Sequence, residues 1–117
     1  MVVRDAGTLE ARGVVITLYG IKAYDADAQC KDGKGRAWAC GAGARAALTM
    51  LIHGRAVNCK VPQSSKQKAL TARCSVGGTD LSVWMVTQGW AKPAPQADPK
   101  LAAAADNARK KKIGIWR

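Results

Sequence analysis

The sequence predicts an α+β fold in which a small five-stranded OB-type β-barrel carries three helices. Stretches that alternate apolar and polar residues, as strands do, come first, and a segment with helical period follows. A second pair of alternating stretches and two more helical segments complete the order. We expect residues 1–117 to fold as one domain. With 48% hydrophobic and 23% charged residues, the composition excludes a disordered chain.

The first strands are predicted near the start of the chain. Residues 14–19 alternate with a period of two, and residues 7–11 precede them across an Arg12-Gly13 turn, which predicts a β-hairpin. Residues 1–4 add a short strand before it. Residues 22–40 show no clean period and contain glycines among charged side chains, so they predict a long loop.

A helix and the clearest strand pair follow. Residues 41–52 place Ala44 and Leu48 on one face of a helix. Residues 55–61 and 69–76 then alternate as two strands of a hairpin. If the loop between these strands is symmetric, Cys59 and Cys74 lie directly opposite each other, close enough for a disulfide.

The four cysteines predict two disulfides. Pairing Cys59 with Cys74 leaves Cys30 with Cys40, and of the three connectivities open to four cysteines this one fits the geometry best. No zinc-type spacing is present, and His53 is expected to be exposed at a helix end. Disulfides indicate an oxidising compartment, with four free thiols in a cytosolic protein as the alternative.

Two helices are predicted in the last third of the chain. Asp80 caps a short helix that ends at Gly89, and Asp98 caps a helix whose first residue is Pro99. Residues 91–97 contain two prolines and predict a loop. The last helix ends in four consecutive basic residues, which suit the negative end of the helix dipole. We expect the four tryptophans to pack in the core and against helices rather than to stack on bases.

The charge predicts a polyanionic partner. Lys and Arg number 19 and Asp and Glu 8, a net charge of +11. Such an excess favours nucleic acid, anionic polysaccharide or an acidic lipid surface, and a charge that merely aids solubility is the alternative. No apolar run approaches the ~18 residues of a membrane span. No signal peptide opens the chain, so we expect any targeting segment to be already removed or never present.

Short motifs from Asp5 to Trp116 resemble, in order and spacing, the staphylococcal-nuclease-like (thermonuclease-like) family. They are Gly7-Thr8-Leu9-Glu10, Leu18-Tyr19-Gly20-Ile21, Gln29-Cys30, Trp38-Ala39-Cys40-Gly41, Ala72-Arg73-Cys74, Gly78-Thr79-Asp80-Leu81, Met85-Val86, Gln88-Gly89-Trp90-Ala91 and Gly114-Ile115-Trp116. The resemblance implies a five-stranded OB barrel with three helices. For cysteine-containing bacterial members it also implies a periplasmic or secreted location.

The resemblance implies a calcium-dependent nuclease site of two aspartates, a glutamate and two arginines, and this sequence departs from it at each position. The positions of the two metal-binding aspartates are occupied by Gly7 and Lys22, and the position of the glutamate by the shorter Asp25. The positions of the two arginines are occupied by Thr17 and Ala69. Because the loss of one transition-state contact typically slows a reaction about 10²- to 10³-fold, these departures predict no catalytic residue, no metal ligand and no cofactor.

Lysines at and beside the former metal face predict an anion-binding site formed by Lys22, Lys66 and Lys68. A merely solvated Lys22 is the alternative. We therefore expect a catalytically degenerate nuclease-like domain that binds a polyanion, nucleic acid foremost, or a protein partner. A divergent or residual calcium-dependent nuclease that hydrolyses phosphodiester bonds is the alternative function, and a structural module whose charge has no partner is a third.

Overall fold

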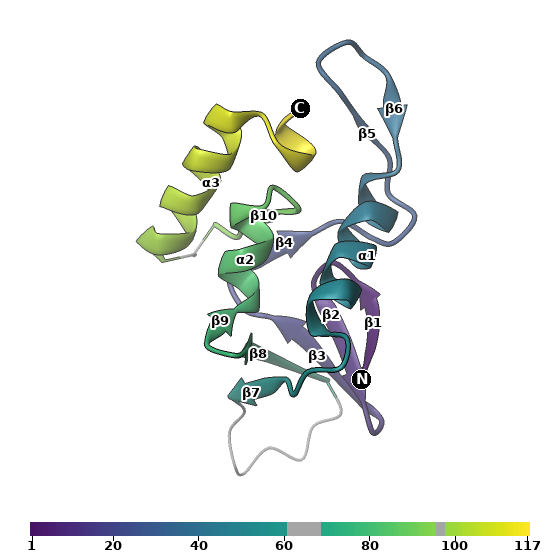
Figure 1. Cartoon of the computed structure of the whole chain (residues 1–117), viewed down its shortest axis with the longest axis vertical. Helices are drawn as coiled ribbons and strands as arrows, with labels where there is room; N and C mark the ends of the chain where they lie inside the picture. Colours follow the sequence, from purple (N-terminus) through teal and green to yellow (C-terminus); the bar gives the residue numbers. More distant parts are fainter. Residues whose placement is uncertain (61–68, 96–97) are drawn as a thin grey trace.

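A computed structural model describes residues 1–60, 69–95 and 98–117 (Figure 1). Within these residues, a mixed sheet and two small two-stranded sheets combine with three α-helices, which confirms the predicted α+β class. The helices are α1 (Cys40–Ile52), α2 (Leu81–Thr87) and α3 (Pro99–Lys111), and a 3-10 turn, η1 (Gly114–Trp116), follows α3. None of the helices in the described part of the chain has the length and hydropathy needed to cross a membrane.

The main sheet has the strand order β1-β2-β3-β8-β7, with β9 beside β8. β3 and β8 pair in parallel, and the other neighbours pair antiparallel. The five strands of the path are those that the sequence predicts around residues 1–19, 55–61 and 69–76. Their bounds are β1 (Val2–Asp5), β2 (Thr8–Ala11), β3 (Val14–Leu18), β7 (Asn58–Lys60) and β8 (Ala69–Val76), and the additional strand β9 spans Thr79–Asp80.

Two segments predicted as loops contain strands. β4 (Ile21–Ala23) and β10 (Ala91–Pro93) pair with each other, and β5 (Cys30–Lys31) pairs with β6 (Ala37–Trp38) in a hairpin. Strands of two or three residues are too short to display a period of two, which is why the predictions for residues 22–40 and 91–97 were wrong. Pro93 contributed to the prediction of a loop, because proline argues against a strand in a sequence. It is nevertheless tolerated in an edge strand such as β10.

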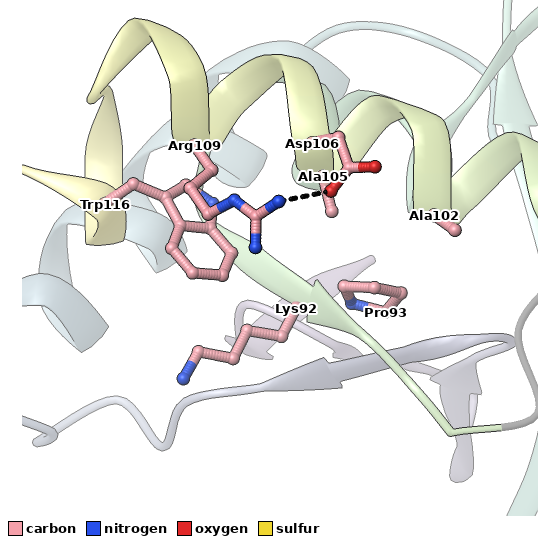
Figure 2. Close-up of a pocket in the computed structure, with 7 residues that line it drawn as sticks. All are labelled: Lys92, Pro93, Ala102, Ala105, Asp106, Arg109 and Trp116. Atoms are coloured by element: carbon pink, nitrogen blue, oxygen red, sulfur yellow. Dashed lines mark hydrogen bonds and ion pairs between the residues drawn. The ribbon is translucent and has the colours of Figure 1, made fainter.

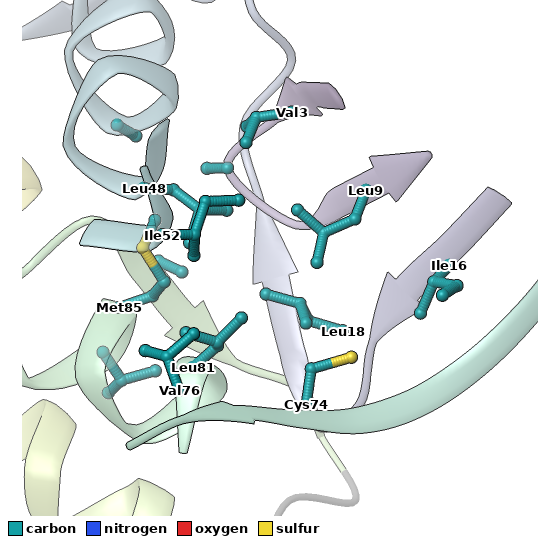
Figure 3. Close-up of a cluster of buried hydrophobic side chains, with 14 of the residues drawn as sticks. Val3, Leu9, Ile16, Leu18, Leu48, Ile52, Cys74, Val76, Leu81 and Met85 are labelled. Carbon is teal, nitrogen blue, oxygen red and sulfur yellow. The ribbon is translucent and has the colours of Figure 1, made fainter. Parts of the chain in front are cut away.

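The core lies between the main sheet and the helices, where side chains from β2, β3, β8, α1 and α2 gather in one cluster (Figure 3). Ala44 and Leu48 face it from α1, as the helical period predicts. Asp80 and Asp98 cap α2 and α3 as predicted, since each carboxylate accepts a backbone N–H three residues on, at 3.0 and 3.1 Å. His53 is exposed at the end of α1, also as predicted.

Two glycines allow the backbones that follow α2 and α3 to touch. Gly89 and Gly114 have φ values of +78° and +58°. A Cβ on Gly89 would lie 2.4 Å from the carbonyl oxygen of Ile113, and one on Gly114 would lie 2.1 Å from the carbonyl oxygen of Gly89. The Ile115 N–H donates to that same Gly89 oxygen at 2.7 Å. The Gly89-Trp90 and Gly114-Ile115 motifs are therefore two sides of one contact.

Both predicted disulfides are present. Cys30–Cys40 ties the β5–β6 hairpin to the first residue of α1, and Cys59–Cys74 joins β7 to β8 at directly paired positions with Cα atoms 4.0 Å apart. The predicted register and connectivity are confirmed, and no cysteine is free. Two disulfides are consistent with an oxidising, extracellular or periplasmic location.

Candidate functional site

The β4–β10 ladder places Lys22 directly opposite Lys92. Directly paired residues of antiparallel strands project to the same side, with Cβ atoms about 4.5–5.5 Å apart. Both lysines are exposed, and no ion pair in residues 1–60, 69–95 and 98–117 involves either of them. Two positive charges that face each other repel, so an anion between them would stabilise this pair, which we call the lysine pair.

A groove of about 290 Å³ adjoins the lysine pair, between β10 and α3 (Figure 2). Lys92 and Pro93 form one wall, and α3 forms the other with Arg109, whose Nη2 donates to Asp106 Oδ1 at 2.8 Å. Trp116 lies at one end, its ring centroid 5.6 Å from Lys92 Nζ. The Lys92 ammonium therefore sits over an aromatic face, which favours a cation there. The groove combines positive charge with an aromatic side chain.

The structure places the positions at which the resemblance expects nuclease groups. Thr17 is exposed on β3 and is paired with Thr8 on one side and Thr71 on the other. Ala69 is the first residue of β8. Asp25 is exposed in a turn, where its carbonyl oxygen accepts the Ala28 N–H at 3.0 Å. At these described positions the chain therefore has neutral residues, a lysine or a single exposed aspartate, where the resemblance expects arginines and metal-binding carboxylates.

These side chains do not fit a calcium ion, which takes six to eight oxygen ligands. In the described part of the chain, no group of three or more His, Cys, Asp or Glu side chains could hold a metal ion. Lys22 is a positive charge at a position where the resemblance expects a metal-binding aspartate. At Gly7, an added Cβ would lie 2.7 Å from the Cβ of Ala23, so an aspartate there would require β4 to move. The nearby Asp5 carboxylate already accepts the Gly7 N–H at 2.8 Å.

Of the three lysines predicted to bind an anion, the structure places Lys22, whereas Lys66 and Lys68 lie outside the described residues. The partner that sequence reasoning missed is Lys92, because residues 91–97 were predicted to be a loop. One signal was available. Ile21-Lys22-Ala23 and Ala91-Lys92-Pro93 share the pattern apolar–lysine–apolar, as two paired edge strands can.

Arg73 is a basic side chain that is already paired. Its Nη2 donates to Asp98 Oδ2 at 3.0 Å, and its guanidinium lies 4.7 Å from the ring centroid of Tyr19. The hydrogen bond to Asp98 raises the pKa of Arg73, and the same bond, with the Leu101 N–H, lowers the pKa of Asp98. Arg73 therefore ties β8 to the start of α3 instead of offering a free charge.

The tryptophans are half-buried. Trp84 and Trp90 pack against the core, as the sequence predicts. Trp38 lies with its ring centroid 6.1 Å from that of Trp90, and the Arg117 guanidinium carbon covers it at 3.9 Å from the centroid. Trp116, by contrast, lines the groove beside Lys92.

Comparison with known proteins identifies the fold. A family model described as "Staphylococcal nuclease homologue" matches residues 15–117, which is most of the chain. A search of curated proteins finds no match. A domain of this kind indicates a nuclease-related or nucleic-acid-binding function. Because the family model covers nearly every element from β3 onwards, the chain belongs to the staphylococcal nuclease homologue family.

Proposed function

We propose that this protein binds nucleic acid without cleaving it, and that the lysine pair Lys22 and Lys92 holds a backbone phosphate. The register of β4 and β10 carries the proposal, because it sets two exposed lysines at directly paired positions. A phosphate can accept charge-assisted hydrogen bonds from both groups at once. Its negative charge would also relieve their mutual repulsion.

Nucleic acid is the polyanion that the other observations favour. The chain belongs to a nuclease-related family, and its net charge of +11 creates a long-range attraction for a phosphate backbone. Lys66 and Lys68, in the segment before β8, are proposed as further phosphate contacts. The two disulfides support a periplasmic or secreted protein that meets nucleic acid outside the cytosol.

The absence of cleavage is proposed from the chemistry of the residues at the former site. Cleavage by the family's calcium route needs carboxylates around the cation, a general base, and arginines on the phosphate. This chain has Lys22 and Gly7 where the carboxylates are expected, and Gly7 has no room for a longer side chain beside Ala23. Thr17 cannot stabilise the added negative charge of the transition state as a guanidinium would.

The binding experiment measures affinity for a fluorescein-labelled 20-base-pair DNA duplex by anisotropy over a salt series. We expect the logarithm of the association constant to fall linearly with the logarithm of salt concentration. Replacing both lysines (Lys22→Gln, Lys92→Gln) should lower the slope by about 1, since the pair holds one phosphate and each neutralised phosphate contributes about 0.9. Arg55→Gln with Lys60→Gln removes the same charge from exposed residues outside the ladder and should leave the slope near the wild-type value.

The cleavage experiment incubates supercoiled plasmid with wild-type protein and Ca²⁺, beside the Lys22→Asp variant. We expect no nicking by the wild-type protein. Nicking at the rates of an active nuclease would overturn the non-catalytic part of the proposal. Failure of the wild-type protein to bind the duplex even at low salt would overturn the nucleic-acid part and favour a protein partner.

A further inference from the structure

We infer that a second surface, at one end of the long axis of the molecule, contacts the phosphate backbone of the nucleic acid. This inference rests on the proposed nucleic-acid binding. The surface, which we call the basic pole, comprises the β5–β6 hairpin, the last turn of α3 and the residue after η1. Its basic residues are Lys31, Lys34, Arg36, Arg109, Lys110, Lys111, Lys112 and Arg117.

The β5–β6 hairpin, which we call the hairpin arm, is fixed both at its base and in its turn. It projects beyond the helices at one end of the molecule (Figure 1). The Cys30–Cys40 disulfide anchors its base to α1. In its turn, Asp32 Oδ1 accepts the N–H groups of Lys34 and Arg36, both at 2.9 Å. The backbone that carries the basic residues of this arm therefore has a defined position before any ligand arrives.

The C-terminal segment connects this arm to α3. Arg117 covers the Trp38 ring of β6, and its carbonyl carbon lies 3.9 Å from where a Cβ on Gly33 would be. η1 joins Arg117 to the end of α3, and the last turn of α3 lies at the same end of the long axis as the hairpin (Figure 1). The two groups of basic residues therefore lie at the same end of the molecule, with Arg117 against the hairpin.

The charge of the basic pole is largely uncompensated. Its two side-chain carboxylates are already paired, Asp32 with Arg36 at 3.2 Å and Asp106 with Arg109 at 2.8 Å. Five exposed lysines then have no ion-pair partner among the described residues: Lys31, Lys34, Lys110, Lys111 and Lys112. A helix dipole accounts for lysines at the end of α3 but for none in the hairpin.

The groove beside the lysine pair runs towards the basic pole, because Arg109 and Trp116 line the groove and belong to the segments that build the pole (Figure 2). A nucleic-acid backbone that binds Lys22 and Lys92 could thus continue along the groove to α3 and the hairpin. A repeating chain of phosphates fits such a row of separate cations, whereas a single small anion would occupy one of them.

The test compares three variants in the duplex-binding assay. The first replaces the three lysines at the end of α3 (Lys110→Gln, Lys111→Gln, Lys112→Gln), and the second replaces the two of the hairpin (Lys31→Gln, Lys34→Gln). The matched control, Arg12→Gln with Arg55→Gln and Lys60→Gln, changes exposed basic residues outside the pole and alters the net charge as the first variant does. Thermal unfolding verifies that each variant is folded.

We expect the slope of the salt dependence to fall by about 3 in the first variant and about 2 in the second, at about 0.9 per lost contact. At 0.1 M salt the first variant should lose roughly 10²- to 10³-fold in affinity. The control should keep the wild-type slope. If control and pole variants lose equally, only net charge matters and the inference is wrong. If the wild-type protein binds and only the lysine-pair variant is impaired, the inference fails while the proposed function stands.

Discussion

The lysine pair predicts a substitution that raises stability while it weakens binding. In Lys22→Asp, the residue opposite Lys92 changes from a like charge to an opposite charge. Like charges directly opposite on a sheet destabilise it and opposite charges stabilise it, each by roughly 0.2–1 kcal/mol. Since both side chains are exposed, solvent holds each contribution near the lower end of that range. The combined gain should be about 0.5 kcal/mol, or roughly 2 °C in the thermal midpoint.

The assay is thermal unfolding at 0.01 M and 1 M salt, where the Debye length is about 30 Å and about 3 Å. We expect the gain at low salt and its near disappearance at high salt. Lys22→Gln, which removes the repulsion without creating an attraction, should give about half the gain. Adding Lys92→Asp to Lys22→Asp restores two like charges and should abolish it. The same Lys22→Asp variant should bind duplex DNA more weakly than the wild type.

The reasoning would be refuted by a Lys22→Asp protein that is less stable than the wild type at low salt, or by a gain that persists at 1 M salt. Either result would mean that the two side chains do not interact through their charges. A gain in stability without any loss of DNA binding would separate the electrostatics from the function. In that case the repulsion would have no role in binding a phosphate.

Three further predictions concern the scaffold. Gly89→Ala should lower the free energy of unfolding by about 2–5 kcal/mol, because its Cβ would collide with the backbone of Ile113. Gly54→Ala, with a similar φ of +70° but no atom near its Cβ position, should lower it by only about 1 kcal/mol. Urea denaturation measures the difference, and equal losses would contradict the close contact. Cys59→Ser with Cys74→Ser removes a cross-link with a sequence separation of 15 and should cost about 3 kcal/mol in the same assay, a result contradicted by an unchanged midpoint. Asp98→Asn keeps a side chain that can cap α3 but removes a carboxylate whose pKa is lowered in the folded protein. As the pH drops below about 4, the wild type loses the stability that this carboxylate contributes, so the variant should lose less stability than the wild type. Parallel curves of stability against pH would contradict this.

Features that depend on residues close in sequence, or on one register, could be predicted. Asp80 and Asp98 cap their helices because a cap needs only its own three neighbours. The bond between Cys59 and Cys74 followed from the symmetry of one hairpin. The β4–β10 pairing could not be predicted in this way, because nothing local brings Lys22 to Lys92. In the sequence, α1 and α2 lie between β4 and β10, so the pairing of the two lysines depends on how these helices pack against the sheet.

The scaffold and the candidate site depend on different residues, and this separation would allow the family fold to carry the non-catalytic function that we propose. The close approach of Gly89 to Gly114 is a matter of backbone packing and involves no side chain of the site. Lys22 and Thr17, by contrast, are exposed, so their identity contributes little to the core. Gly7 matters both to the packing of the scaffold and to the candidate site. Its close approach to Ala23 leaves no space for an aspartate. Recovery of a metal site would therefore need a change in the packing of β4 as well as a new carboxylate, and the fold alone does not imply the reaction.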